Sequence, residues 1–356
     1  MKTIHFLLAW VLSVTVYTET NAQQWTRIDK LPHSDFSALE VIDGTLYAAH
    51  RSTLYYSNDN GVNWSQVTMS ALTLDPMCMI QFGGRLYVGT YNRGIYSAPM
   101  NNLQGAWTQN LNNVPITSFV EKDNILYAST EGSGVLRSNG DGQFHWFSNG
   151  LPNYSNNVSK VISAPNGLIA TAGGNGTFYR WNTATHNWDE DYYFAGYSPG
   201  MQVDDALRVG NTIYISRFNM VLRSDDSGAN WTHDQVGLQN GHNRYLYAGE
   251  QTLYALTTVF TGDDNLTFLR KRPLNAPSQS SWATDPEVLP FYTYAMREFG
   301  NTLFAGSNLG LYYKGNHLGT GHPEREQNTL VVYPNPSKRR YLLDQGQRPR
   351  YRNFHL

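Results

Sequence analysis

Arginine, aromatic and acidic residues recur where short apolar runs of the chain end, at positions that a set of loops would bring together. The candidate ligand-binding residues of this kind are Arg51, Asp75, Tyr91, Arg93, Glu131, Arg217, His242, Arg244 and Tyr292. Aromatic rings stack on the apolar faces of sugars and pack against peptides, while guanidinium and carboxylate groups orient the polar groups of a ligand. We therefore predict that these residues bind a glycan or an extracellular protein.

The sequence contains no motif of a known catalytic or metal centre. Neither H-E-x-x-H nor C-x-x-C occurs, and the ten histidines are scattered. The glycine-rich stretch at residues 173–176 lacks the lysine of a phosphate-binding loop. The single cysteine, Cys78, lies in an apolar run without a neighbouring histidine, which predicts a buried and unreactive thiol. We expect no metal and no cofactor, and the sequence leaves any catalytic residue unknown.

The elements that would position these loops are short strands joined by tight turns. The pattern S-x-D-x-G-x-N-W occurs twice, at residues 57–64 and 224–231, and each copy follows a short apolar run. An Asp in such a turn accepts hydrogen bonds from the backbone N–H groups that follow it, and Gly supplies a backbone conformation with positive φ. Each copy is therefore predicted to join two strands.

This repeated pattern resembles the Asp-box, or BNR repeat, of sialidase-type β-propellers. The resemblance implies an all-β propeller in which the box residues are structural. They are Ser57, Asp59, Gly61 and Trp64 in the first copy and Ser224, Asp226, Gly228 and Trp231 in the second. Other repeats lose the Asp, the Gly or the spacing, so we predict that the motif holds turns and binds no ligand.

A second pattern gives the number of repeats. A turn residue followed by a short apolar strand recurs about every 40 residues, a period typical of propeller blades. Its marker residues are Leu46, Leu86, Leu126, Leu168, Ile213, Leu253 and Leu303. A tryptophan precedes each marker, as Trp25, Trp64, Trp107, Trp146, Trp188, Trp231 and Trp282, and we expect each to anchor an outer strand. Both patterns predict seven units.

The two ends of the repeat region complete each other. The chain begins its repeats with a tryptophan strand at Trp25, while the last unit has no such strand after Tyr313. Pairing the first strand with the last unit would remove open sheet edges. We therefore predict an all-β, seven-bladed β-propeller of four-stranded antiparallel blades, closed by the N-terminal strand and spanning residues 23–318.

The segments outside the repeats indicate export. Residues 1–22 contain Lys2, an apolar run and a polar end, as in a secretory signal peptide. Residues 330–337 end in Y-P-N-P-S and resemble the start of a type IX secretion sorting domain of the Bacteroidetes, so residues 319–337 are expected to be a linker and partial sorting segment. Residues 338–356 form a basic tail, predicted to be disordered.

Location and partners follow from these segments and from the charge. We expect a secreted or outer-surface protein without a transmembrane segment, recognised by an export machinery through the C-terminal signal if that signal is intact. The formal net charge of −2 gives no general attraction to nucleic acid, so no nucleic-acid partner is expected.

Three functions are consistent with this sequence. The preferred one is a non-catalytic binding or scaffold propeller for a glycan or a protein. The first alternative is a divergent glycoside hydrolase, because the resemblance extends to sialidases, which use an arginine triad and a Tyr nucleophile paired with Glu. However, Arg27-Ile28-Asp29 only approximates the R-I-P signature of that family. Its propellers are also typically six-bladed. The second alternative is an assembly factor for a protein complex, since similar single propellers act in photosystem assembly.

Overall fold

The computed structural model describes residues 24–140, 142–152, 157–172, 177–192, 203–218, 220–238, 241–260, 265–289 and 292–315. The signal peptide, the sorting segment and the basic tail expected from the sequence lie outside these ranges, so the predicted domain bounds stay predictions. Within the described residues the chain forms 28 strands and one short 3-10 helix, η1 (Met100–Asn102).

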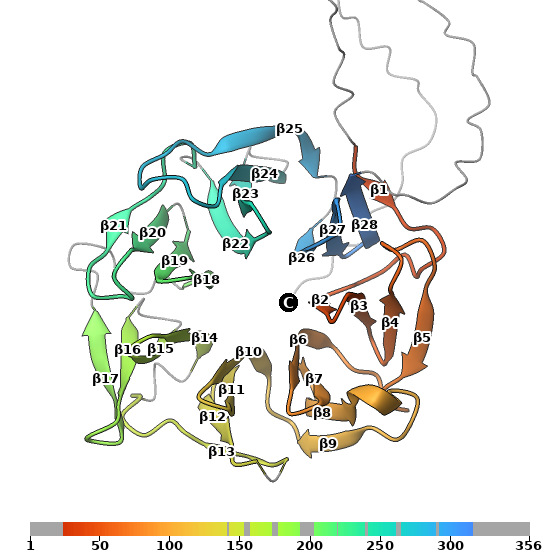
Figure 1. The fold of residues 1–356 in the computed structure, drawn as a ribbon, viewed down its shortest axis with the longest axis horizontal. Coiled ribbons are helices and arrows are strands. Elements are labelled where there is room, and N and C mark those ends of the chain that lie inside the picture. Colours follow the sequence, from red (N-terminus) through yellow and green to blue (C-terminus); the bar gives the residue numbers. More distant parts are fainter. Residues whose placement is uncertain are drawn as a thin grey trace, which may run out of the picture. The chain divides into compact units, whose positions relative to one another are not determined.

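The strands form seven four-stranded antiparallel sheets, which are the blades of a β-propeller (Figure 1). Blade 1 is β2 (Ala38–Ile42), β3 (Thr45–His50), β4 (Thr53–Ser57) and β5 (Ser65–Thr68). Blade 2 is β6 (Pro76–Phe82), β7 (Arg85–Thr90), β8 (Gly94–Pro99) and β9 (Thr108–Leu111). Blade 3 is β10 (Ile116–Lys122), β11 (Ile125–Thr130), β12 (Gly134–Ser138) and β13 (Phe144–Trp146). Blade 4 is β14 (Val158–Ala164), β15 (Gly167–Ala172), β16 (Phe178–Asn182) and β17 (Asn187–Tyr192).

The remaining three blades follow the same order around the ring. Blade 5 is β18 (Asp205–Val209), β19 (Thr212–Arg217), β20 (Met220–Ser224) and β21 (Thr232–His233). Blade 6 is β22 (His242–Ala248), β23 (Thr252–Phe260), β24 (Asn265–Pro273) and β25 (Ala283–Leu289). Blade 7 is β26 (Thr293–Phe299), β27 (Thr302–Ser307), β28 (Gly310–Gly315) and β1 (Thr26–Arg27). The prediction of seven four-stranded blades is confirmed.

The second strand of each blade is covered on both faces, which explains the apolar marker runs in the sequence. In β3, Leu46 and Ala48 pack in the hydrophobic cluster shared with blade 7, whereas Tyr47 and Ala49 pack in the cluster shared with blade 2. Successive side chains of a strand point to opposite faces, so a strand between two neighbours needs apolar residues at every position. The core of the molecule is this series of clusters between adjacent blades.

The ring is closed by residues from the two ends of the repeat region, as predicted. β1 pairs antiparallel with β28, with Thr26 opposite Tyr313 and Arg27 opposite Tyr312. The next backbone N–H, of Ile28, donates to the carbonyl of Leu311 at 2.9 Å. The backbone N–H of Trp25 also donates to the Glu287 carboxylate of blade 6, at 3.0 Å to Oε1. The first strand therefore pairs with blade 7 and also contacts blade 6.

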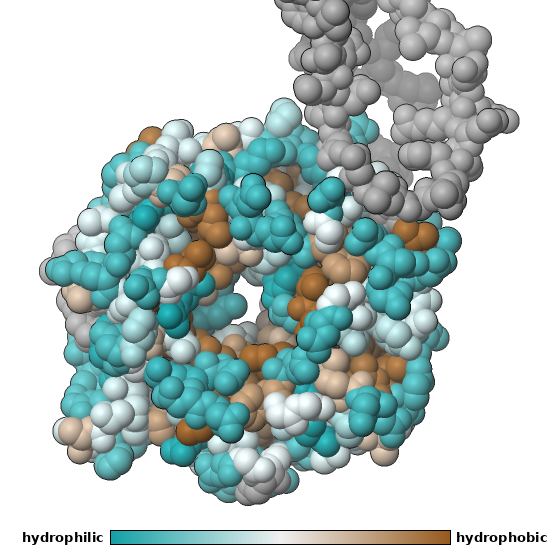
Figure 2. Space-filling view, in the orientation of Figure 1, coloured by the Kyte–Doolittle hydropathy of each residue, from teal (hydrophilic) through white to brown (hydrophobic). Residues whose placement is uncertain are grey.

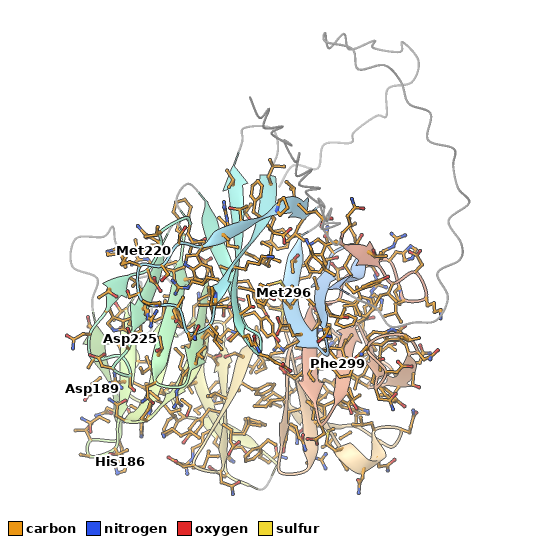
Figure 3. The ribbon with its side chains drawn as sticks, turned by 45° about the horizontal axis from the view of Figure 1, so that its top comes forward. His186, Asp189, Met220, Asp225, Met296 and Phe299 are labelled. Atoms are coloured by element: carbon orange, nitrogen blue, oxygen red, sulfur yellow. The ribbon has the colours of Figure 1, made fainter. Side chains whose placement is uncertain are left out.

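The two ends of the inner strands define two sides of the propeller. We call "loop face" the side formed by the loops between second and third strands and by those that lead into the next blade. We call "turn rim" the opposite side, with the turns between first and second strands and between third and fourth. Figure 3 labels Met220, at the start of β20, and Asp225, just past its end, so the course of one strand between the two sides can be followed.

One of the seven predicted tryptophan anchors is wrong. The side chain of Trp146 is 61% exposed, whereas Trp188 and Trp282 are buried. In blade 3 the residue opposite Ser138 is Phe144, which is buried, and by pairing register it takes the place that Trp64 has opposite Ser57 in blade 1. The turn of blade 3 is one residue shorter than an Asp-box, so the anchoring position falls on Phe144.

Candidate functional site

A repeated hydrogen bond shapes the loops between second and third strands. The hydroxyl of the last residue of the second strand donates back across the loop, as Thr90 does to the carbonyl of Gly94 at 2.9 Å and Thr130 to that of Gly134 at 2.8 Å. Both glycines have positive φ, and a Cβ on Gly94 would overlap the carbonyl oxygen of Leu111. These tight loops hold the residues at their tips in fixed places.

Several predicted ligand residues occupy those tips. Arg51 lies between β3 and β4, Tyr91 and Arg93 between β7 and β8, and Glu131 between β11 and β12. Arg51, Tyr91 and Glu131 are exposed, while Arg93 is partly buried. The blades therefore present them at equivalent positions on the loop face.

The other predicted residues are less uniform. Asp75 is exposed before β6, and its carbonyl accepts the backbone N–H of Tyr91 at 2.8 Å. Tyr292 is exposed before β26. Arg217 is only 1% exposed, so its side chain does not reach the surface. The side chain of Arg244 lies outside the part of the chain that the structure describes.

Exposed apolar side chains gather on the loop face. Among the described residues, eight of the nine exposed large hydrophobic residues belong to this face by that definition: Leu72, Met77, Tyr91, Phe218, Val236, Tyr292, Tyr294 and Leu309. Six of them belong to blades 7 and 2 or to the loop from blade 1 to blade 2, and we call these six the apolar arc: Leu72, Met77, Tyr91, Tyr292, Tyr294 and Leu309. Large contiguous apolar patches on a protein surface often mark interaction sites, so this part of the loop face is a candidate binding surface.

Polar contacts of blade 1 fix part of the apolar arc. The Tyr294 hydroxyl donates to Asp35 Oδ1 at 3.1 Å, and the Asp35 carbonyl contacts Nδ1 of His50 at 2.8 Å. The rings of Tyr292 and Tyr294 lie 5.5 Å apart. Burial, together with the Asp35 carboxylate, raises the pKa of Tyr294 to about 12, so the hydroxyl stays protonated as a donor. Tyr294 is thus held in place between blades 7 and 1.

A second cluster lies where blades 5 and 6 meet on the loop face. Nε2 of His242 is 2.7 Å from Oδ2 of Asp204, and the backbone N–H of Phe218 donates to the same oxygen at 2.8 Å. The rings of Phe218 and His242 are 5.1 Å apart. The predicted residue His242 is therefore engaged with Asp204 and lies in a different place from the apolar arc.

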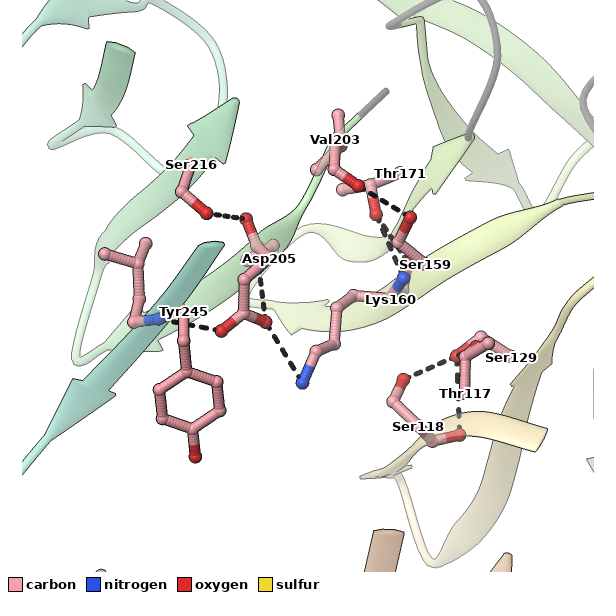
Figure 4. A network of polar contacts seen from close by, with 12 residues as sticks. Thr117, Ser118, Ser129, Ser159, Lys160, Thr171, Val203, Asp205, Ser216 and Tyr245 are labelled. Atoms are coloured by element: carbon pink, nitrogen blue, oxygen red, sulfur yellow. Dashed lines mark hydrogen bonds and ion pairs between the residues drawn. The ribbon is translucent and has the colours of Figure 1, made fainter. Parts of the chain in front are cut away.

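The central channel is lined by charged side chains of the inner strands. Figure 2 shows a central opening in the ring, with hydrophobic residues around it. A hollow of about 400 Å³ between the inner strands is lined by Glu40, Lys160, Asp205, Tyr245 and Arg297, among others. Nζ of Lys160 is 3.1 Å from Asp205, whose Oδ2 accepts the backbone N–H of Leu246 at 2.9 Å (Figure 4). Three inner strands, β14, β18 and β22, are joined by this one carboxylate.

A second ion pair in the channel, between Arg297 and Glu40, joins blades 7 and 1, and Tyr245 of blade 6 contacts it. Nη2 of Arg297 is 2.7 Å from Oε2 of Glu40, and its Nη1 donates to the hydroxyl of Tyr245 at 3.0 Å. Burial opposes the charged forms of Lys160 and Arg297, but the carboxylates of Asp205 and Glu40 outweigh it and raise the pKa of both cations. The two channel carboxylates are therefore paired with protonated partners.

The two Asp-box turns form the hydrogen bonds that their residue types suggest. Oδ1 of Asp59 accepts the backbone N–H of Asn63 at 2.9 Å and the Ser57 hydroxyl at 2.8 Å, and Nε1 of Trp64 donates to the Gly61 carbonyl at 2.8 Å. Slight burial opposes ionisation of Asp59, yet the bonds from Asn63 and Ser57 lower its pKa.

The second copy repeats this arrangement. Oδ1 of Asp226 accepts the backbone N–H of Asn230 at 2.8 Å, and the Ser224 hydroxyl accepts that of Gly228 at 2.7 Å. Hydrogen bonds from the Asn230 side chain and backbone and from Ser224 lower the pKa of Asp226 to about 2. In both copies the polar groups are used within the turn.

Two further features of the described residues bear on function. No three His, Cys, Asp or Glu side chains among them gather as they would around a metal ion. Burial raises the pKa of the Cys78 thiol to about 12. Within the same ranges, none of the helices has the length and apolar character needed to cross a membrane.

Comparisons with known proteins support the fold. No protein-family model matches this chain, and a search of curated proteins finds no relative. Similar solved structures include YCF48 from Cyanidioschyzon merolae, with 12% identity, a TM-score of 0.59 and coverage of 82% of this chain and 98% of that one. A structure titled "YCF48 bound to D1 peptide" has 13% identity and a TM-score of 0.60, and covers 85% and 96%.

The extracellular domain of a putative hybrid two-component system protein from B. thetaiotaomicron is also similar. It shows 15% identity and a TM-score of 0.61, and the match covers 85% of this chain but 44% of that one. At these identities the likeness establishes a β-propeller fold and no more.

The sequence did not identify Leu72, Met77, Tyr294 or Leu309 as site residues. Met77 and Tyr294 are the second residues of β6 and β26. An apolar residue at the loop end of an inner strand gives no signal in one sequence, because such strands are apolar along most of their length.

Proposed function

We propose that this protein is an exported, non-catalytic binding propeller that recognises a polypeptide partner through the apolar arc on its loop face. The observation that carries this proposal is the gathering of exposed apolar side chains there, with one member, Tyr294, held by a hydrogen bond to the next blade.

The composition of the arc favours a polypeptide over a glycan. Sugars stack on flat aromatic faces, which the three tyrosines offer, but Leu72, Met77 and Leu309 provide flexible aliphatic surface. Buried centres of protein interfaces are enriched in Tyr and Met and depleted in charged residues. Methionine adapts to side chains of varied shape, which suits the apolar residues of a peptide.

The similar structures are consistent with this proposal. One of them is a propeller of the same fold bound to a peptide, and another is an extracellular domain. Together with the signal peptide expected at residues 1–22, they favour a surface or secreted protein that meets its partner outside the cell, in a scaffold or assembly role.

The hydrolase alternative has less support. A glycosidase needs one carboxyl group to donate a proton and a second to act as base or nucleophile. In the described part of the channel, Glu40 and Asp205 are each held in an ion pair with a cation, Arg297 and Lys160. Both carboxylates are therefore already engaged by side chains of the protein.

Selection of peptides on the full-length protein tests the proposal. A displayed random-peptide library should yield peptides that bind the wild type, and Tyr91→Ala combined with Leu309→Ala should weaken them at least tenfold. Trp146→Ala is the matched control, because it also removes an exposed aromatic ring, in this case from an outer strand.

Two outcomes would contradict the proposal. One is a glycan array in which glycans bind the loop face, with the same loss in the Tyr91→Ala/Leu309→Ala variant, while no peptide is selected. The other is turnover of a glycan by the wild type that disappears when Glu40 or Asp205 is replaced.

A further inference from the structure

A polar cleft lies between blades 6 and 7, at the turn rim and away from the apolar arc. Its volume is about 440 Å³, within the range of small-molecule sites. Blade 6 contributes residues of the β22–β23 turn and of β23, β24 and β25, and blade 7 contributes the β26–β27 turn and parts of β26, β27 and β28. We call it the blade 6–7 cleft.

Ring closure explains why the cleft is open at this place. In blade 5 the turn between third and fourth strands covers the preceding blade: Gly228 packs against Ile169 and Arg180 of blade 4, and Nη2 of Arg180 donates to the Ser227 carbonyl at 3.4 Å. In the corresponding turn of blade 6, the carbonyl of Ala276 accepts a hydrogen bond from Nη1 of Arg223 of blade 5 at 2.8 Å.

Blade 7 cannot supply such a turn, because its third and fourth strands come from opposite ends of the repeat region. β28 ends at Gly315, and its partner β1 begins at Thr26. Among the described residues, no turn of blade 7 therefore covers, on blade 6, the space that a turn covers on blades 4 and 5.

The pairing of the second and third strands shows which residues of blade 6 lie where no turn of blade 7 covers them. Ile169 is opposite Arg180 in blade 4, Tyr214 is opposite Arg223 in blade 5, and Tyr254 is opposite Lys271 in blade 6. Tyr254 and Lys271 both line the cleft. Whereas Arg180 and Arg223 donate to the next blade's turn, the Lys271 side chain is 47% exposed, and its ammonium lies 3.5 Å from Asp285.

The acidic groups of the cleft are held in fixed positions. Glu298 Oε1 accepts the Tyr254 hydroxyl at 2.6 Å, and its Oε2 accepts the backbone N–H of Glu250 at 2.8 Å. Asp285 Oδ1 is 2.7 Å from Nζ of Lys314, which also contacts Glu287. Burial opposes ionisation of Asp285, but the ammonium group of Lys314 lowers the pKa of its carboxyl group. Burial and the hydrogen bond to Glu298 raise the pKa of the Tyr254 hydroxyl.

The charges of the lining nearly balance. Three carboxylates, of Glu250, Asp285 and Glu298, face the two ammonium groups of Lys271 and Lys314. A strongly charged ligand would meet groups of its own sign, whereas a hydroxyl group can donate to a carboxylate and accept from an ammonium group. Such charge-assisted hydrogen bonds are stronger than neutral ones. Leu269 and Leu303 add apolar surface to the lining.

We infer that the blade 6–7 cleft binds a neutral, hydroxyl-rich ligand, a sugar unit, with Lys271 donating to its hydroxyl oxygens and Glu298 accepting from its hydroxyl groups. The site is separate from the apolar arc and does not rest on the function proposed for it. A free sugar and the terminal unit of a longer glycan share this chemistry.

Binding of neutral monosaccharides and of oligosaccharides ending in them, measured on the full-length protein by ligand-observed NMR and calorimetry, tests the inference. Wild type should bind at least one neutral sugar, and Lys271→Met should weaken it at least tenfold, with Lys271→Arg restoring part of the affinity. Tighter binding of the oligosaccharide would indicate a glycan end, and equal binding a free sugar.

The controls separate this site from the loop face. Lys122→Met, at the turn rim of blade 3, and Tyr91→Ala, on the loop face, should leave sugar affinity unchanged. Thermal unfolding should show that Lys271→Met folds normally, as expected for an exposed side chain. The inference is overturned if no neutral sugar binds, if Lys271→Met binds as tightly as wild type, or if carboxylated sugars bind better than their neutral counterparts.

Discussion

The loop face and the turn rim use opposite kinds of residue for opposite purposes. The Asp-box turns of the rim are rich in Asp, Ser and Asn, which are typical of binding sites, yet these groups satisfy one another within eight residues. The loops of the loop face carry no such repeated motif, but they leave apolar side chains exposed. The polar residues of the rim therefore stabilise its turns, whereas exposed apolar residues identify the candidate site on the loop face.

The same contrast applies within the turn rim. Where a turn covers the preceding blade, as in blades 5 and 6, its carbonyls accept hydrogen bonds from Arg180 and Arg223. Where ring closure removes the turn, Lys271 faces a cleft. The blade 6–7 cleft thus lies at the place on the described part of the rim where the repeat is interrupted.

A large effect on stability is expected at the outer edge between blades 5 and 6. Arg272 and Asp234 form a buried ion pair there, with Nη1 of Arg272 2.9 Å from Oδ1 of Asp234. Arg272→Met leaves a buried carboxylate without its main partner, so unfolding free energy in denaturant should fall by about 3–5 kcal/mol. The double variant Arg272→Met/Asp234→Leu should recover part of this loss, and a double variant as unstable as the single one would show that the pair is not the cause.

A smaller effect is expected at the first Asp-box. Asp59→Ala removes the acceptor for Asn63 and Ser57 and should lower the unfolding free energy by about 1–2 kcal/mol. Peptide affinity of the loop face should stay at the wild-type value. A variant of normal stability that no longer binds would assign the turn a binding role and break the contrast between the two sides.

The second Asp-box should contribute through pH. The pKa of Asp226 is about 2 in the folded protein against an ordinary value of 3.8, so its ionised form stabilises the fold above pH 3.8 and loses that effect as the pH falls toward 2. Asp226→Asn should therefore differ from wild type in thermal midpoint at pH 5, and the difference should shrink as the pH approaches 2. A difference that stays constant over this range would argue against the lowered pKa.

The smallest effect on stability is expected on the loop face itself. Tyr91 is nearly half exposed, and Tyr91→Ala should change the unfolding free energy by no more than about 0.5 kcal/mol while weakening peptide binding. Trp188→Ala, which empties a buried aromatic site, should cost about 3–5 kcal/mol in the same denaturation experiment. If Tyr91→Ala were equally costly, the exposed arc would be part of the core.

Much of the fold could be predicted from local patterns. The marker strands, the two full Asp-box turns and the closure by Trp25–Arg27 all depend on residues whose spacing is visible in the chain. Trp146 was misplaced because a turn shorter by one residue moves the anchoring position from the tryptophan to Phe144. Spacing alone does not show which residue of an outer strand faces inward.

The candidate sites depended on the ring as a whole. The sequence predicted that Arg51, Tyr91 and Glu131 lie in loops of the candidate site. It could not predict the hydrogen bond between Tyr294 and Asp35, because these residues lie 259 positions apart. Lys160, Asp205 and Leu246 likewise come from three blades and meet only in the channel. No local pattern records contacts of this kind.

The sequence by itself determined the blades, their number and the strand that closes them, because period, turn chemistry and apolar runs act over a few residues at a time. The tertiary structure alone decided which apolar side chains stay exposed on the loop face and where the described part of the rim forms a cleft. Exposure depends on what a neighbouring blade covers, and the blade 6–7 cleft exists because the ring closes with strands from two ends of the repeat region.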